Sequence, residues 1–325
     1  MTAFILRRSL TAILVVLAMA TIVFFGLNVI GDPTHLLVDP GANQAEIEAT
    51  RVALGLDRPL WVQFAVFLRK AVQGDLGASF VFGRPAMEVI LERLPATLEL
   101  ALVAFVISLV LGLPLGLYAG LKPDSLGARA IMTGSIFGFS LPSFWVGIVL
   151  VMIFSVNLGW LPATGRGQTQ ELFGMQLSLA TADGWRHILL PAINLALFKT
   201  SLIIRLTRAG ASEVVRQDYV KFARAKGVRG LRLVGLHIGK NVMVPIVTVI
   251  GLELGHLIAF SVVTESIFAW PGVGKLIIES ILHLDRPVVV AYLMIIVVLF
   301  TIINLVVDIL YSLLDPRIRI GATAH

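Results

Sequence analysis

The chain has 325 residues, of which 57% are hydrophobic and only 14% are charged. Soluble domains average roughly half apolar and about a quarter charged residues, so this composition excludes a soluble fold and indicates an integral membrane protein. The absence of cysteine excludes disulfides and thiolate metal sites. The formal net charge of +6 is accounted for by basic loops on one side of a membrane, without a nucleic acid partner.

Hydropathy predicts an all-α membrane protein with six transmembrane helices, because lipid-exposed backbone must satisfy its hydrogen bonds internally. The segments close to the length of about 20 residues that spans a bilayer are 9–30, 96–121, 131–157, 188–206, 243–263 and 287–312. The first segment also fits a cleavable signal peptide, because Arg7-Arg8 precedes it and Ala18-Met19-Ala20 lies inside it. The apolar run continues to Ile30, which is too long for a signal core, so we expect a retained helix.

The basic residues predict the orientation in the membrane. With a cytoplasmic N-terminus, the inner segments carry 15 Lys and Arg residues and the outer segments carry ten. The positive-inside rule therefore predicts a multi-pass protein of the bacterial inner (plasma) membrane with both termini in the cytoplasm. The expected regions are the N-terminus with the first helix (1–30), a periplasmic segment (31–95), a five-helix core (96–312) that contains an inner loop (207–242), and a cytoplasmic tail (313–325).

Two outer segments differ in pattern. Residues 31–95 are too polar to span the membrane, with turns marked by Pro33, Pro40 and Gly41. The stretches 45–54 and 61–72 have apolar residues at helical spacing, so we expect a small helical cap between spans 1 and 2. The Gly-, Thr- and Gln-rich stretch 158–187 predicts an irregular outer loop.

The inner loop contains a basic, alanine-rich segment between two strongly apolar ones. We expect a short helix from Tyr219 to Lys226, with Asp218 as its N-cap and Gly227 as its stop. One interpretation is an ordinary basic loop that touches anionic lipid. The other is a docking element for a partner protein.

The spacing within this helix favours docking. Tyr219, Phe222, Ala223 and Lys226 are separated by three, four and seven residues, so they share one helix face. This face combines two aromatic rings, a small residue and a cation, which suits a helix laid in a partner's groove.

Charged residues inside the predicted spans should point into the bundle or lie near an interface, because facing lipid at mid-bilayer costs at least roughly 2.5–3.5 kcal/mol. These residues are Glu99, Lys199, Glu253 and Asp308. Glu99 and Asp308 lie near span ends, which favours structural pairing.

Glu253 and His256 lie three residues apart, so they could line a polar pathway or relay a proton. Gly251 and Gly255 form a small-xxx-small pair that brings another helix close. An interhelical hydrogen bond is therefore the plainer account of this polar pair.

Prolines mark a second candidate stretch. Pro114, Pro142 and Pro191 can kink helices or open backbone groups toward a cavity, and simple packing kinks are the alternative. The candidate pathway residues around the central proline are Ser140, Ser143, Phe144 and Trp145.

The sequence offers little support for catalysis. The pairs Gly239-Lys240 and Gly274-Lys275 lack the first glycine and the final Ser or Thr of a phosphate-binding loop. No nucleophile elbow, zinc-ligand spacing or paired carboxylate constellation is present, so we expect a chain that is not an enzyme.

Several short pieces carry a resemblance to a known family. They are Leu54-Gly55-Leu56-Asp57, Gly74-Asp75-Leu76-Gly77, Arg93-Leu94-Pro95-Ala96-Thr97, Leu141-Pro142-Ser143-Phe144-Trp145, Gly159-Trp160-Leu161-Pro162, Asp218-Tyr219-Val220, Ala223-Arg224-Ala225-Lys226-Gly227, Trp270-Pro271-Gly272-Val273-Gly274 and Asp315-Pro316-Arg317. Together they resemble the permeases of binding-protein-dependent ABC transporters of the dipeptide, oligopeptide and nickel group. The long outer segment is similar to that of the first of their two permease types.

The resemblance implies a permease that forms half of the translocation pathway of an ATP-driven importer. Its partners would be a second homologous permease, two ATPase subunits that bind ATP and Mg, and an external solute-binding protein, with membrane lipid around it and no nucleic acid. The inner-loop helix would be the coupling helix that sits in a groove of the ATPase. The residues implied for coupling are Tyr219, Val220, Phe222, Ala223, Arg224, Ala225, Lys226 and Gly227.

The chain departs from the broader permease pattern at two places. Lys221-Phe222-Ala223 stands where the generic pattern has Glu-Ala-Ala. Gly230, Gly235 and Gly239 weaken the helix expected next.

The cargo stays open among dipeptides, longer peptides, glutathione, nickel chelates and some sugars. Whether the two ATPases are identical is open as well. A proton-coupled secondary transporter that uses Glu253 and His256 is the alternative function.

Overall fold

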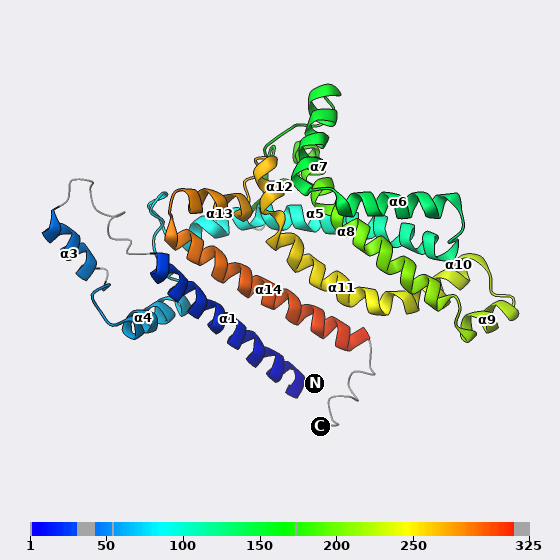
Figure 1. Cartoon of the computed structure of the whole chain (residues 1–325), viewed down its shortest axis with the longest axis horizontal. Helices are drawn as coiled ribbons and strands as arrows, with labels where there is room; N and C mark the ends of the chain where they lie inside the picture. The colour runs from blue at the N-terminus through cyan, green and yellow to red at the C-terminus, as the bar shows by residue number, and fades with distance from the viewer. Residues whose placement is uncertain (1, 31–42, 54, 173, 315–325) are drawn as a thin grey trace. The chain divides into compact units, whose positions relative to one another are not determined.

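The computed structural model describes residues 2–30, 43–53, 55–172 and 174–314, and these residues are mainly helical (Figure 1). The predicted turns at Pro33, Pro40 and Gly41 and most of the tail 313–325 lie outside them. The chain divides into two compact units, which are described separately. The first comprises residues 1–93 and 276–301, and the second comprises 94–275 and 302–325.

The elements follow the predicted order of helices. They are α1 (Thr2–Ile30), α3 (Gln44–Ala53), α4 (Leu60–Val72), α5 (Ala86–Leu121), α6 (Leu126–Ser140), α7 (Ser143–Leu150), the π-helix η1 (Val151–Asn157), β1 (Gln170–Leu172), β2 (Met175–Leu177), α8 (Ala182–Val214), α9 (Asp218–Ala225), α10 (Gly230–Arg232), the π-helix η2 (Leu233–Gly239), α11 (Lys240–Ala259), α12 (Ser261–Ile267), α13 (Val273–Leu282) and α14 (Arg286–Leu314).

Among the described residues, four helices are long and apolar enough to cross a membrane, or five if the bent pair of α6 with α7 and η1 counts as one span. The four lie in α1, α5, α8 and α14. The fifth predicted span, 243–263, corresponds to α11 and the start of α12, which meet at Phe260.

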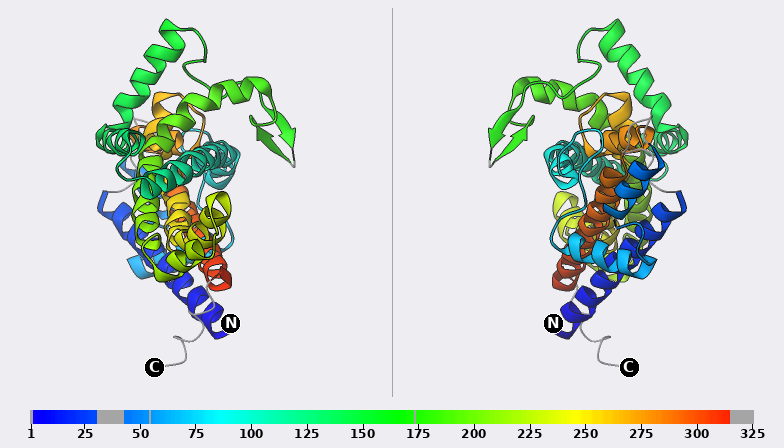
Figure 2. Two further views of the ribbon diagram at one scale, coloured as in Figure 1. Left: turned by 90° about the vertical axis from the view of Figure 1, so that its right-hand side faces the viewer. Right: turned by 90° about the vertical axis from the view of Figure 1, so that its left-hand side faces the viewer.

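The prediction of one continuous span at 131–157 needs correction, because its two halves are bent by 106° (Figure 2). Leu141 has an extended backbone with φ −81° and ψ 135°. Pro142 causes this conformation, since a proline disfavours the helical region for the residue before it. By contrast, α5 continues through Pro114 and α8 continues through Pro191.

The stretch 158–187, predicted as an irregular outer loop, contains regular structure. Strands β1 and β2 form an antiparallel pair in which Gln170 faces Leu177 and Leu172 faces Met175. Strands of three residues are too short to show an alternating pattern, so periodicity could not predict this hairpin.

In the first unit, the predicted helical stretches 45–54 and 61–72 correspond to α3 and α4. Helix α4 packs on α1 through aromatic rings, with the centroid of Phe24 5.2 Å from Phe64 and 5.6 Å from Phe67. On α1, Ala20 and Val23 belong to a buried cluster with Val290 and Met294 of α14. This apolar cluster joins segments that are far apart in the sequence.

In the second unit, α5 packs directly on α8 along a stripe of glycines. A Cβ placed on Gly112 would lie 2.7 Å from Ile203 Cγ2, and one on Gly116 would lie 2.6 Å from the Ile204 carbonyl oxygen. A Cβ on Gly120 would lie 2.6 Å from the Ala211 Cβ. Glycine is therefore required at three successive turns for the two backbones to approach this closely.

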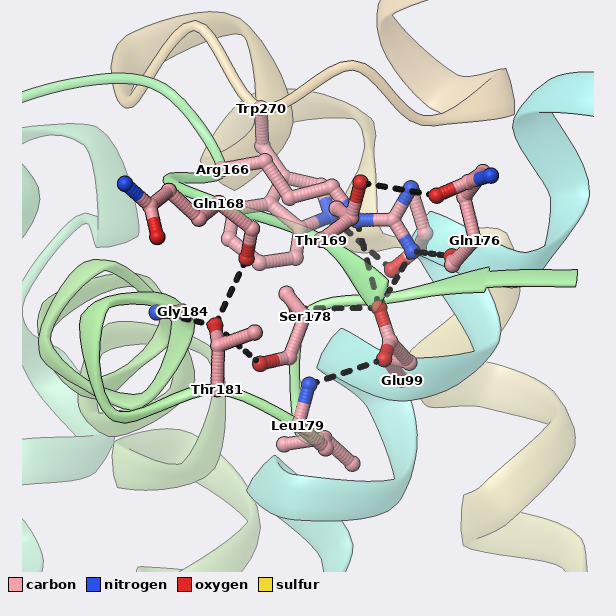
Figure 3. A network of polar contacts seen from close by, with 11 residues as sticks. Glu99, Arg166, Gln168, Thr169, Gln176, Ser178, Leu179, Thr181, Gly184 and Trp270 are labelled. Atoms are coloured by element: carbon pink, nitrogen blue, oxygen red, sulfur yellow. Dashed lines mark hydrogen bonds and ion pairs between the residues drawn. The ribbon is translucent and has the colours of Figure 1, made fainter. Parts of the chain in front are cut away.

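A buried ion pair fastens the hairpin segment to α5 (Figure 3). Arg166 donates from Nε to Glu99 Oε2 at 3.2 Å and from a terminal nitrogen to the Gln176 carbonyl oxygen at 2.6 Å. The Ser178 hydroxyl and the Leu179 backbone N–H also donate to the Glu99 carboxylate, at 3.0 and 3.2 Å. The predicted structural pairing of Glu99 is confirmed, whereas the side chain of Asp308 lies outside the described part of the structure.

A second buried carboxylate fastens the loop after α12. Glu265 is fully buried and accepts hydrogen bonds from the Thr97 and Ser261 hydroxyls at 2.6 and 2.8 Å. It also accepts from the Lys275 backbone N–H at 2.9 Å. Because Glu265 lies in α12 and Thr97 lies in α5, their hydrogen bond holds α12 against α5.

The glycine stripe predicts opposite effects for two Gly→Ala substitutions. Gly116→Ala should lower the free energy of unfolding by about 1–3 kcal/mol, because the methyl group overpacks the contact with α8. Gly134→Ala in α6 is the matched control, since nothing lies within 4 Å of its Cβ position. It should be neutral or stabilising by up to about 1 kcal/mol. Denaturant unfolding in detergent measures the free energy of unfolding of both variants. Equal changes in the two variants would contradict the close contact of α5 with α8 at Gly116.

Candidate functional site

Helix α9 forms at the predicted place in the segment 207–242, which we call the inner loop after its predicted location, and its ends differ from the prediction. Gln217 is its N-cap residue, so the prediction that Asp218 is the cap was wrong. Asp218 instead lies in the first turn, where its carboxylate suits the helix dipole. It accepts a hydrogen bond from Lys221 Nζ at 2.8 Å, which lowers the pKa of Asp218 below its ordinary value. Gly227 has φ +83°, which confirms it as the stop.

One side of α9 is seated on the subunit's own core. Val220 is fully buried and Ala223 is 6% exposed. They belong to a cluster whose other buried members are Ala211, Leu233, Ile238, Val242 and Ile246. The prediction that Ala223 shares the outward face is therefore wrong. Ala223 is only about 60° around the helix from Val220, and the core draws it to the buried side.

The other side of α9 carries an exposed aromatic pair. Tyr219 is 43% exposed and Phe222 is 60% exposed. The ammonium group of Lys226 lies 4.5 Å from the centre of the Phe222 ring. We call Tyr219, Phe222 and Lys226 the docking face. Large exposed aromatic side chains next to a cation are typical of protein contacts.

The connections of α9 place it between two long helices. Helix α8 ends at Val214, and only three residues separate it from the start of α9 at Asp218. After α9 the chain passes through η2. The glycines were expected to weaken an α-helix in this region, and part of it is a π-helix instead. Helix α11 follows directly at Lys240. A displacement of α9 would therefore act on both α8 and α11.

An ion pair joins these same two helices within the predicted spans. Lys199 of α8 pairs with Glu253 of α11, and the side chains are 12% and 10% exposed. His256 lies one turn further along α11, with Nδ1 3.6 Å from Glu253 Oε1. The structure thus brings Glu253 and His256 together as the sequence indicated. The pairing of Glu253 with Lys199, which the sequence did not indicate, makes the interhelical contact ionic.

Aromatic rings extend this ion pair along α8 toward α9. Lys199 Nζ lies 5.4 Å from the centre of the Phe198 ring, which stacks on Phe139 of α6 at 4.4 Å. The Arg205 guanidinium lies 4.1 Å from the centre of the Phe139 ring. We call the connected set the polar-aromatic array. Its members are Arg205, Phe139, Phe198, Lys199, Glu253 and His256.

The other candidate pathway residues lie at the bend between α6 and α7. Ser140 closes α6 with its hydroxyl bonded to the Ile136 carbonyl oxygen at 2.9 Å, and Ser143 opens α7. Phe144 and Trp145 are 53% and 48% exposed. Their role in a pathway stays a prediction. Sequence reasoning missed Phe139, Phe198 and Arg205, because an aromatic or basic residue in an apolar run gives no signal of its neighbours.

The seating of α9 predicts different outcomes for two neighbouring alanines. Ala223→Glu should lower the stability of the inner loop by about 3 kcal/mol, since it buries an unpaired carboxylate. Ala225→Glu is the matched control, because Ala225 lies on the same helix and is exposed. Limited proteolysis of the purified chain should cleave the loop faster only in Ala223→Glu. Equal protection of the two variants would show that α9 is not seated this way.

Two protein-family models match the sequence. The family described as binding-protein-dependent transport system inner membrane component matches residues 112–320, and its N-terminal counterpart matches residues 1–101. The chain is 39% identical to the di/tripeptide transport system permease protein DppB of Pseudomonas aeruginosa, covering 91% of this chain and 95% of that protein. It is 38% identical to the oligopeptide transport system permease protein AppB of Bacillus subtilis, covering 98% and 100%.

A solved structure shares the fold. The inward-facing MetNI methionine ABC transporter contains a chain with a TM-score of 0.54 and 16% identity, and the match covers 70% of this chain and 97% of that chain. At this identity the likeness concerns the fold alone.

Proposed function

We propose, from the premise that this chain belongs to the inner membrane component family of binding-protein-dependent transport systems, that α9 is the element through which partner ATPases drive it. Members of this family are the permeases of ABC importers, and the chain is such a permease. The observation that carries the proposal is the two-sided nature of α9. Val220 and Ala223 hold it on the core, while the docking face stays exposed.

Coupling through α9 is mechanical. An ATPase that closes on its nucleotide moves the groove in which the docking face lies, and α9 transmits this movement to α8 and α11. The energy is supplied by ATP and Mg bound to separate ATPase subunits. In this chain, the sequence around Gly239-Lys240 and Gly274-Lys275 does not fit a phosphate-binding loop.

The assembly proposed for this chain includes a second, homologous permease and a solute-binding protein. Each permease supplies half of the pathway, which opens alternately to the two sides of the membrane. The names of the relatives from Pseudomonas aeruginosa and Bacillus subtilis support di- or oligopeptides as the cargo. The proton-coupled secondary transporter considered for Glu253 and His256 finds no support in these comparisons.

The proposed topology has six spans with both termini in the cytoplasm. Residues 31–95 form a helical periplasmic segment, 207–242 is the cytoplasmic loop, and 313–325 is a cytoplasmic tail. The excess of basic residues in the proposed inner segments supports this orientation. For the fifth span, 243–263, support comes from α11, and for the third span, 131–157, from the bent pair.

Single cysteines in this cysteine-free chain test the topology. Lys221→Cys should be protected from a membrane-impermeant thiol reagent in intact cells and labelled after the membrane is opened. Asp57→Cys should be labelled in intact cells. The reverse pattern would overturn the orientation.

Truncation of the docking face tests the coupling role. Phe222→Ala should weaken binding of the ATPase by about 2 kcal/mol, or roughly 30-fold, because aromatic anchors dominate protein interfaces. The fold should persist, since the Phe222 side chain is mostly exposed.

Val72→Ala is the control, because Val72 is 89% exposed but belongs to the proposed periplasmic segment. Co-purification of the ATPase and ATP-driven peptide uptake should fall only in Phe222→Ala. If the ATPase co-purifies normally with Phe222→Ala and uptake is unchanged, the docking face has been misassigned.

A further inference from the structure

We propose that the polar-aromatic array is a peptide-contacting track, and that its Lys199–Glu253 pair is the subsite for the two charged ends of a zwitterionic peptide. The inference rests on the proposed function as a peptide permease and names where the permease itself recognises the cargo.

The array runs along the direction of transport. Helix α8 leads toward α9 and α11 leads away from it, so Arg205 lies on the α9 side of the array and His256 lies at the far end. Lys199 and Glu253 lie between them and join α8 to α11. Six residues of α8 and three of α11 correspond to about 14 Å of helix, which is close to half of the hydrocarbon thickness of about 30 Å.

Several members of the array are also partly exposed. Phe139 and Phe198 are 39% and 41% exposed, and the His256 side chain is 43% exposed. Ionisable residues within a span almost always face the bundle interior or a water-filled cavity, because lipid does not solvate them. The exposed part of the array is therefore expected to border the pathway, next to α8, against which both α6 and α11 pack (Figure 1).

The chemistry of the pair fits a zwitterion. In the resting pair, the Lys199 ammonium and the Glu253 carboxylate neutralise each other with little exposure to water. A peptide with free ends can exchange partners with them, placing its carboxylate on Lys199 and its ammonium on Glu253. All four charges are then paired, whereas a peptide blocked at one end leaves a single buried charge without a partner.

The rest of the array matches the remaining features of a short peptide. The stacked rings of Phe139 and Phe198 offer apolar surface to peptide side chains. Arg205 lies beyond them on the side of α9, and its guanidinium can receive the carboxylate after it leaves Lys199. Charges and aromatic faces thus alternate along the track.

The test uses the purified complete transporter and a photoreactive dipeptide that carries a benzophenone side chain. Labelling should map to fragments of α8 and α11. Unlabelled alanyl-phenylalanine should compete at least tenfold better than the same dipeptide with an acetylated N-terminus or an amidated C-terminus. Equal competition by the free and blocked dipeptides in the unmodified complex would overturn the proposal without any variant.

Two variants assign the ends. Lys199→Gln should abolish the preference over the amidated dipeptide and keep the preference over the acetylated one, while Glu253→Gln should do the reverse. Lys199→Arg should keep both preferences. A pair that serves only to hold α8 and α11 together would instead lower labelling by all peptides alike, with unchanged ratios.

Two further measurements separate this proposal from the function on which it rests. Arg84→Gln, which removes an exposed ion pair with Glu92 in the first unit, should leave labelling and both preferences unchanged. If the reconstituted complex with its binding protein takes up no peptide with ATP, the proposed function fails. If uptake occurs but labelling lies outside α8 and α11, only the subsite fails.

Discussion

Inside a bilayer no water is available to solvate a charge, so each polar side chain must find its partner within the protein. This constraint organises the second unit. The Glu99 carboxylate accepts hydrogen bonds from Arg166, Ser178 and a backbone N–H. The Glu265 carboxylate accepts hydrogen bonds from Thr97, Ser261 and a backbone N–H. Lys199 forms an ion pair with Glu253. The contacts of Glu99, the contact of Glu265 with Thr97 and the pair of Lys199 with Glu253 join segments distant in sequence, so these polar groups help to fix which helices are neighbours.

Close backbone packing complements these polar contacts. The glycine stripe of α5 leaves no room for a side chain against α8, so these helices are fitted together over three turns. Apolar helices in lipid gain little from the hydrophobic effect and associate through such contacts instead. Helix α8 leads almost directly into α9. Because α8 is packed closely against α5, a displacement of α9 would be transmitted to both helices.

The two candidate sites place different demands on their residues. The docking face must expose aromatic rings to an aqueous compartment, and it does so on a helix whose opposite side is anchored by Val220 and Ala223. The polar-aromatic array must keep charges within the membrane, and it does so by pairing them and flanking them with rings. In the proposed mechanism, a cycle of ATP hydrolysis alters the contacts made with a peptide, because α8 and α11 contribute to the array and also flank α9 in the chain.

The sequence by itself determined the features that depend on local composition. Apolar runs predicted where the helices lie, and the position of Gly227 predicted the end of α9, because only glycine adopts its backbone conformation without strain. Short motifs along the chain were enough to indicate the permease family.

Only the tertiary structure decided which side of α9 is buried, because Ala223 suits a core and a surface equally well. It also decided that Glu99 meets Arg166, that Lys199 meets Glu253, and that the chain bends by 106° after α6. The physical reason is that a charge in a span requires a partner, but sequence spacing does not say which one. That choice is made when helices distant in the chain pack together.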